Sequence, residues 1–200
     1  MNIKEQKEVL REKIWKLLED KNIARFPFPI KDRIPNFEGS EKAANLIQEL
    51  DEWRNARVIV ANPDFAQKKV RELVLKNNKT LIMASPRLKH GYLEVKNVKG
   101  KEEFASTIAG AFRYGKKLDE VLKPDLIVTG CVAVDRNGWR LGKGRGYGDK
   151  EISRITEKFG KVPIITTVHN LQIIKKVPHE EHDTRVDYII TPTEIITSVN

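Results

Sequence analysis

The sequence contains one cysteine and no long hydrophobic run. Cys131 has no second cysteine with which to form an internal disulfide, and a cysteine-rich zinc site is excluded as well. No apolar stretch approaches the ~18 residues that a membrane-spanning helix requires. The first residues are charged and helical in pattern, without the apolar segment of a secretory signal. These absences predict a cytoplasmic protein.

Acidic residues are fewer than basic ones. Asp and Glu number 28 against 37 Lys and Arg, so the formal net charge is +9. A basic chain favours anionic partners such as nucleotides, polyanionic cofactors or nucleic acid. The same excess also fits a solvated, charge-rich surface, so charge alone does not choose between these interpretations.

The chain length and the 40% of hydrophobic residues predict one domain over 1–200 with a sizeable core. Helical periodicity and short β-branched runs alternate along the chain. Helices are expected over 4–20, 40–53, 64–76, 102–122 (with a break near Gly115) and 149–159, with Ser40 as an N-cap. Strands are expected over 57–61, 81–84, 126–134, 162–168 and 186–191. Because a strand–helix–strand unit needs a crossover connection, we expect a three-layer α/β/α fold with a mostly parallel sheet.

A glycine-rich segment is the most informative part of the chain. Glycine occupies every second position from 142 to 148, and Arg140, Lys143 and Arg145 lie among these glycines. Glycine permits positive φ and removes the side chain that would keep a ligand away from the backbone. Successive backbone N–H groups can then converge on an anion, and the N-terminus of the following helix adds partial positive charge. We interpret the segment as a phosphate-binding loop.

The glycine spacing differs from two familiar nucleotide-binding patterns. The G-x-x-x-x-G-K-[ST] spacing of a Walker loop is absent, and no strand directly abuts the glycines as a dinucleotide fingerprint requires. The other interpretation is a flexible surface loop whose charges keep it soluble. Four alternating glycines with interleaved cations favour phosphate binding over that interpretation.

Several segments, in the same order, resemble the motifs of one family. Residues 140–149 resemble the R-L-G-x-G-x-G-Y-Y-D signature of the 5-formyltetrahydrofolate cyclo-ligase (methenyltetrahydrofolate synthetase) family. Lys7-x-x-x-Arg11 is similar to the K-x-x-x-R near that family's N-terminus. Three further segments are similar to motifs of the family: 124–128 to its P-D strand, 135–138 to its D-x-x-G turn, and 182–192 to its H-D…T-P ending. The loop itself resembles a divergent branch, the methenyltetrahydrofolate synthase domain-containing proteins.

The resemblance implies a NagB/RpiA/CoA-transferase-like fold and a ligase reaction of folate and one-carbon metabolism. Mg-ATP and 5-formyltetrahydrofolate would give 5,10-methenyltetrahydrofolate, ADP and phosphate. ATP would phosphorylate the formyl oxygen, N10 would attack the activated carbon, and phosphate would leave. Such a reaction asks the protein mainly for positioning and charge stabilisation, which cations and backbone N–H groups supply.

The same resemblance implies which residues form the site. Those expected to bind ATP are Lys7, Arg11, Arg140, Leu141, Gly142, Lys143, Gly144, Arg145, Gly146, Tyr147 and Gly148. Those expected near the folate are Lys143, Gly144, Arg145, Gly146 and Tyr147, with Lys143 and Arg145 as the catalytic residues. Asp149 and Asp187 are expected to hold Mg²⁺ together with phosphate oxygens and water. Without the resemblance, Asp149 would be a carboxylate in the first turn of a helix and Asp187 a strand-entry residue.

The folate side of the site departs from the family pattern at two points. Gly148 replaces the second tyrosine of the signature, and the stretch 61–68, where the family carries a folate-binding glutamate, offers Asp64 instead. A pterin is normally held by a carboxylate that accepts its two N–H donors, so losing one weakens discrimination. The expected substrate is therefore 5-formyltetrahydrofolate or a related reduced pterin. Two alternatives stay open: a non-catalytic nucleic-acid-binding protein that reuses the domain, or an ATP-dependent enzyme for another small substrate.

Other chemically notable residues have simpler interpretations. His179 and His182 lack the spacing of the HExxH zinc motif and lie in an expected loop. Cys131 lies in an apolar run, which favours a packed core thiol. Trp139, next to the glycine loop, either stacks on a ring or covers the edge of the core.

Overall fold

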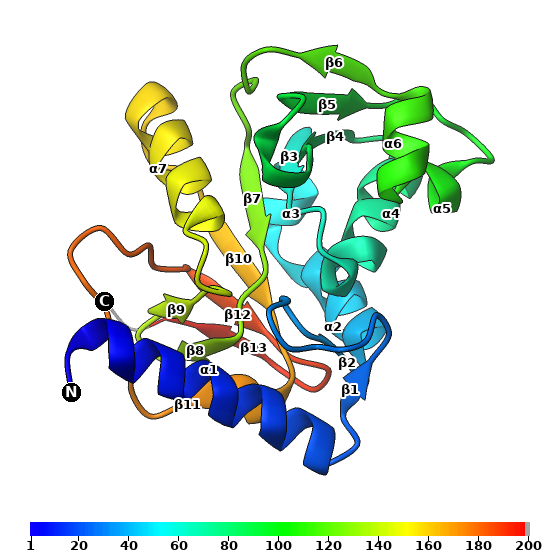
Figure 1. Ribbon diagram of the computed structural model, residues 1–200. Coiled ribbons are helices and arrows are strands. Elements are labelled where there is room, and N and C mark those ends of the chain that lie inside the picture. The colour runs from blue at the N-terminus through cyan, green and yellow to red at the C-terminus, as the bar shows by residue number, and fades with distance from the viewer. Residues whose placement is uncertain (199–200) are drawn as a thin grey trace.

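A twisted eight-stranded sheet forms the centre of the protein in a computed structural model that describes residues 1–198 (Figure 1). Val199 and Asn200, the last two residues of the domain expected over 1–200, lie outside the described residues. The strand order is β13-β12-β10-β7-β3-β4-β5-β6, and the strands from β12 through β4 are parallel. The bounds are β3 (Val58–Ala61), β4 (Thr80–Ala84), β5 (Tyr92–Val95), β6 (Lys116–Leu118), β7 (Leu126–Thr129), β10 (Ile164–Thr167), β12 (Tyr188–Ile190) and β13 (Ile195–Thr197).

Two small sheets accompany the main one. A two-stranded antiparallel sheet joins β1 (Ala24–Arg25) to β2 (Asn36–Phe37). A three-stranded sheet has the order β11-β8-β9, with bounds β8 (Ala133–Asp135), β9 (Arg140–Leu141) and β11 (Ile173–Ile174). The second of these sheets carries the glycine-rich segment, which follows β9 directly.

Helices cover both faces of the main sheet, so the expected three-layer α/β/α fold is confirmed (Figure 1). Their bounds are α1 (Ile3–Asp20), α2 (Ser40–Leu46), α3 (Asp51–Asn55), α4 (Lys68–Lys76), α5 (Glu102–Ala105), α6 (Ile108–Tyr114) and α7 (Tyr147–Phe159). Short 3-10 turns cover Ile47–Glu49, Phe65–Gln67, Pro86–Leu88 and Asn170–Gln172. Among the described residues, no helix is both long and apolar enough to cross a bilayer.

The two faces follow from the alternation of side chains along each strand. In β3, Ile59 packs in the core with α2 and α4, whereas Val60 packs with α7 on the opposite face. In β7, Leu126 and Val128 face the first core and Ile127 faces the second. A parallel strand buried on both faces needs such a continuous apolar run, which is the pattern that predicted these strands.

The expected strand over 126–134 is two strands in the structure. Strand β7 ends at Thr129, and the chain resumes as β8 in the three-stranded sheet. A Cβ atom on Gly130 would lie 2.6 Å from Cγ2 of Ile34 and 2.7 Å from Oε1 of Gln67, so the chain turns where only glycine fits. An apolar run does not reveal that its two halves belong to different sheets.

Three further expectations about local structure were wrong in whole or in part. The break expected near Gly115 is confirmed, because α6 ends at Tyr114, but the residues after it are not helical: Lys116–Leu118 pairs with β5 as an edge strand. The helix expected over 40–53 is divided among α2, a 3-10 turn and α3. Gly39, with φ of 82°, is the N-cap of α2, rather than Ser40.

Candidate active site

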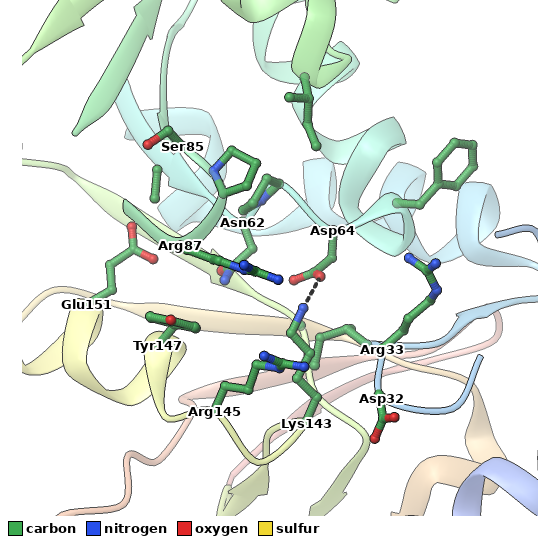
Figure 2. Close-up of a pocket in the computed structure, with 18 of the residues that line it drawn as sticks. Asp32, Arg33, Asn62, Asp64, Ser85, Arg87, Lys143, Arg145, Tyr147 and Glu151 are labelled. Carbon is green, nitrogen blue, oxygen red and sulfur yellow. Dashed lines mark hydrogen bonds and ion pairs between the residues drawn. The ribbon is translucent and has the colours of Figure 1, made fainter. Parts of the chain in front are cut away.

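A cavity of about 660 Å³ opens at the carboxyl ends of the parallel strands (Figure 2). Asn62, Ser85 and Gly130 directly follow β3, β4 and β7, and all three line it. Ligands of open α/β sheets bind at this edge, because the loops that leave the strands converge there. The glycine-rich segment and the start of α7 form another wall, which contributes Lys143, Arg145, Gly146, Tyr147, Gly148, Asp149 and Glu151.

The glycine-rich segment leads into helix α7, as the sequence predicted, but strand β9 directly precedes it, where no strand was expected. Gly144 has φ of 94° and Gly146, the N-cap of α7, has φ of 68°. Both values lie in the left-handed region, where glycine is not strained. Helix α7 begins at Tyr147, two residues earlier than expected. The backbone N–H groups of its first turn, which have no partner within the helix, therefore belong to the end of the glycine-rich segment.

The loop is also a wall of a second cavity of about 520 Å³ on its other side. Arg140, Gly146 and Asp149 line both cavities. The residues expected at the site divide between the two. Lys7, Arg11, Leu141, Gly142 and Gly144 line the second cavity. Lys143, Arg145, Tyr147 and Gly148 line the first.

Lys7 joins α1 to the second cavity by pairing with two carboxylates, Asp183 and Glu180. Its Nζ lies 2.6 Å from Oδ2 of Asp183 and 3.1 Å from Oε2 of Glu180. Burial by itself lowers the pKa of Lys7, but the hydrogen bonds to both carboxylates outweigh it and raise the pKa above its ordinary value. Burial likewise raises the pKa of Asp183, and Lys7 reverses this so that the net pKa is lowered. Lys7 therefore stays a cation at the cavity wall.

Arg11 joins α1 to the loop itself. Its Nε donates to the carbonyl oxygen of Gly142 at 2.8 Å, and Nη1 pairs with Glu8 at 2.7 Å. A Cβ atom on Gly144 would lie 3.2 Å from the guanidinium carbon of Arg11. The guanidinium thus lies close against the loop backbone, and the spacing of Lys7 and Arg11 places both cations on one side of α1.

Arg140 occupies the position between the two cavities. It is buried, and its guanidinium donates to Oδ1 of Asp149 at 2.7 Å and to Oγ1 of Thr184 at 3.1 Å. Asp149 also accepts from the hydroxyl of Thr184 at 2.6 Å. A Cβ atom on Gly148 would lie 2.8 Å from Nη2 of Arg140. The glycine that replaces the second tyrosine of the family signature therefore leaves room for this guanidinium.

The structure does not bring Asp187 to Asp149. Oδ2 of Asp187 accepts from the backbone N–H of Ile164 at 2.8 Å, at the amino ends of β10 and β12. The cavities lie at the opposite, carboxyl edge of the sheet. Asp187 is thus the strand-entry residue of the alternative interpretation. Because Asp149 lines the cavities and Asp187 lies at the opposite edge of the sheet, the two aspartates do not fit a shared magnesium site. No group of three or more metal-ligating side chains occurs among residues 1–198 either.

Two polar side chains from other elements, Asp64 and Arg71, also line the first cavity. Lys143 Nζ lies 3.3 Å from Oδ1 of Asp64, which joins the loop to the segment after β3 (Figure 2). Arg71 on α4 is fully buried and donates to the carbonyl oxygens of Asp64 and Ser106, both at 2.8 Å. Burial lowers the pKa of Arg71 to about 10, which leaves it charged at neutral pH. Arg71 therefore fixes the backbone that carries Asp64.

Sequence reasoning missed Glu151 and Arg71. Glu151 is buried on α7 and lines the first cavity, and burial raises its pKa to about 7. Each is buried on the inner face of its helix, where Val70 and Val74 accompany Arg71 and Ile152 and Ile155 accompany Glu151. A charged residue at such an inward position is the one signal in the sequence that could have identified them.

Three other residues contact neighbouring side chains within the protein. His179 stacks on Trp139 with 3.9 Å between ring centroids, so Trp139 is covered by a neighbouring side chain. Cys131 is buried and lies 3.4 Å from the hydroxyl of Thr166. Burial raises its pKa to about 11, which makes it a packed core thiol rather than a nucleophile.

Comparison with known proteins identifies relatives over nearly the whole chain. The model of the 5-formyltetrahydrofolate cyclo-ligase family matches residues 3–192. A methenyltetrahydrofolate synthase domain-containing protein of Bos taurus is 39% identical over 96% of this chain and 54% of its own length. The Homo sapiens protein of that description is 38% identical over 96% of this chain and 53% of its own length. The chain thus spans about half the length of these relatives.

A solved structure has the same fold. The 5,10-methenyltetrahydrofolate synthetase of Aquifex aeolicus superposes with a TM-score of 0.63 over 97% of this chain and 93% of that one. The two sequences are 20% identical, so this likeness bears on the fold alone.

Proposed function

The chain belongs to the 5-formyltetrahydrofolate cyclo-ligase family, and on that premise we propose that it is an ATP-dependent ligase. Its substrate is 5-formyltetrahydrofolate or a related reduced pterin, and its products are the 5,10-methenyl form, ADP and phosphate. One observation carries the proposal: the glycine loop separates two cavities and is a wall of both. A reaction that transfers a phosphoryl group between two bound molecules needs such an arrangement.

The second cavity is the one that suits ATP. Lys7, Arg11, Lys150 and Arg154 surround it, and the loop backbone adds the left-handed turns at Gly144 and Gly146. Cations and converging N–H groups stabilise a polyphosphate more strongly than any neutral ligand. The first cavity suits the folate, because it offers an exposed aromatic face at Tyr147 and polar side chains of both charges.

Phosphoryl transfer would take place at the glycine loop, which is the wall that the two cavities share. The formyl oxygen of the folate attacks the γ-phosphorus of ATP, the bond to the β-γ bridging oxygen breaks, and ADP leaves. N10 then attacks the activated formyl carbon, the N10 proton is lost, and the C–O bond breaks to release phosphate. Lys143 and Arg145 would counter the negative charge that develops on the transferring group, since both extend from the loop into the first cavity.

Magnesium enters this proposal as part of the substrate, the Mg-ATP complex. Its ligands would be phosphate oxygens and water, because Asp149 is bound by Arg140 and Thr184 and Asp187 lies at the far edge of the sheet. We therefore assign no protein carboxylate pair to the ion.

The proposal is tested by mixing the protein with 5-formyltetrahydrofolate and Mg-ATP and following methenyl absorbance and ADP release. We expect both signals in equal amounts. Lys143→Ala should slow turnover by at least ~100-fold, because it removes a charge that stabilises the transition state. Lys99→Ala, at an exposed position away from both cavities, is the matched control and should retain full turnover.

Two outcomes would contradict parts of the proposal. An absence of methenyl product and of folate-stimulated ADP release would reject the ligase reaction on this substrate. ADP release with another reduced pterin would instead assign the activity to that substrate. Full turnover by Lys143→Ala would reject the catalytic role of Lys143 while leaving the reaction standing.

A further inference from the structure

Glu151 is a buried acceptor that the protein leaves without a partner. It lies in the second turn of α7, is 5% exposed and lines the first cavity. Its Oε1 is buried and has no hydrogen-bond partner among residues 1–198. Figure 2 shows its carboxylate at one end of the cavity, between Tyr147 and Ser85. A buried carboxylate oxygen without a donor is costly, so its presence in a cavity wall points to a donor on the ligand.

The other carboxylates of this cavity are already engaged or solvated. Asp64 pairs with Lys143 at 3.3 Å, and Asp149 pairs with Arg140 at 2.7 Å. Asp32 is exposed to solvent. Glu151 is thus the buried carboxylate of this cavity that can still accept hydrogen bonds from a ligand.

The surroundings of Glu151 suit the edge of a flat ring. Tyr147 lies one helical turn before it on the same side of α7, with its ring beside the carboxylate (Figure 2). The turn Pro86–Leu88 contributes the facing wall, and Arg87 and Leu88 there have φ of 58° and 53°. A planar ligand between these walls would present its edge to Glu151. Two adjacent N–H donors on that edge would satisfy both carboxylate oxygens at once.

We propose that Glu151 accepts the paired N–H donors of the pterin ring and so fixes the orientation of the substrate. This proposal rests on the proposed function, because it concerns the ligand of the same cavity. Asp64, at the position where the family pattern led us to look for such a carboxylate, acts instead as the partner of Lys143. Glu151 is a specificity-determining residue, and it does not touch the transferring phosphoryl group.

The variant Glu151→Gln tests the assignment while keeping the side-chain shape. It replaces one acceptor oxygen by an amide nitrogen, which donates and cannot accept, so one N–H donor of the ring faces a second donor. We expect the dissociation constant for 5-formyltetrahydrofolate to rise roughly 10- to 100-fold, with the dissociation constant for ATP unchanged. Glu41→Gln, at an exposed position of α2, is the matched control and should bind both ligands as the unaltered protein does.

A second measurement does not depend on any variant. The 2-desamino analogue of the folate lacks one of the two donors. The unaltered protein should bind this analogue roughly 10- to 100-fold more weakly than the parent folate, and Glu151→Gln should lose most of that difference. A role in folding alone would not couple the variant to one substituent of the ligand.

The outcomes separate this inference from the proposed function. If the unaltered protein neither binds nor converts 5-formyltetrahydrofolate, the proposed function fails and this assignment falls with it. If the unaltered protein converts the folate but binds the 2-desamino analogue equally well, only the assignment of Glu151 is overturned. Tight folate binding by a folded Glu151→Gln protein would overturn it in the same way.

Discussion

At the scale of single residues, Arg140 is the side chain that connects the two cavities. It lines both cavities, and its guanidinium binds Asp149 on α7 and Thr184 on the segment before β12. Because Gly148 has no side chain, the guanidinium can lie against the loop backbone. A Cβ atom on the family's second tyrosine would lie 2.8 Å from Nη2 of Arg140, which is too close for an ordinary contact. Gly148 is therefore coupled to the position of a buried cation, because a larger residue would require the guanidinium to shift.

Burial of Glu151 makes the stability of the protein depend on pH. Burial raises its pKa from 4.5 to about 7, Arg140 and Arg154 oppose this, and Asp64 adds to it. Between these two pKa values the folded protein holds a proton that the unfolded chain has lost, so the free energy of unfolding falls as pH rises from about 4.5 to about 7. Glu151→Gln removes this loss. The variant should match the unaltered protein near pH 4 and exceed it in stability at pH 8.

Urea unfolding at several pH values measures this difference. Glu41→Gln serves again as the exposed control and should show no such widening of the gap with pH. A constant difference between Glu151→Gln and the unaltered protein from pH 4 to pH 8 would show that Glu151 has an ordinary pKa.

At the scale of elements, α4 holds the segment that leaves β3. The chain after Ala61 carries Asp64 into the first cavity, and the carbonyl groups of Asn62 and Asp64 lie in this connection, outside β3 and α4. Arg71, in the first turn of α4, donates to the carbonyl oxygens of Asn62, Asp64 and Ser106. One buried side chain thus ties the β3–α4 connection to the end of α5.

Replacing Arg71 by methionine should weaken this connection. Arg71→Met keeps most of the length and the apolar stem of the side chain but removes the N–H groups that donate to three carbonyl oxygens. We expect the free energy of unfolding to fall by about 2–4 kcal/mol. We also expect KM for the folate to rise more than KM for ATP, because Asp64 lies in the first cavity. Urea titration and steady-state kinetics measure the two effects.

Lys42→Met, at an exposed position of α2, is the control for removing a cation from a helix. A loss of less than about 1 kcal/mol in Arg71→Met, equal to that of Lys42→Met, would mean that water replaces the guanidinium at these carbonyls.

At the scale of the whole molecule, the central sheet is what places the two cavities. Strands β3, β4 and β7 end side by side, and the loops that follow them meet there (Figure 1). Apolar side chains alternate between the cores on the two faces, so a change in either core acts on the same strand ends. The positions of the residues in the site therefore depend on the packing of the strands that carry them.

Ile127→Ala should test how strongly the second core supports the fold. Ile127 is 1% exposed in the middle of β7, and its truncation leaves a cavity between the sheet and α7. We expect a loss of about 2–5 kcal/mol in the free energy of unfolding. Val9→Ala, at a position of α1 that is 56% exposed, should cost less than about 1 kcal/mol. Thermal unfolding compares them, and equal melting temperatures would contradict the assigned packing of β7.

The elements that local pattern specifies were predicted well. Helix α1, strands β3 and β4, and helix α7 lie within two residues of their expected starts or ends, because each has a clear period of apolar residues. The division of 126–134 between β7 and β8 was missed, since both halves are apolar and the turn at Gly130, where a Cβ atom would collide with Ile34 and Gln67, leaves no sign in an apolar run. The pairing of Asp149 with Asp187 was wrong because sequence order does not tell which edge of the sheet a strand-entry residue occupies.

The amino-acid sequence by itself determined the layered α/β class, the glycine loop that leads into a helix, and the family to which the chain belongs. Those properties depend on periodicity, on glycine positions and on short motifs, which are local. The tertiary structure alone decided that the loop separates two cavities, that Asp64 pairs with Lys143, and that Glu151 is buried without a partner. Such facts depend on which distant segments meet, and burial and pairing are set only when the sheet has brought those segments together.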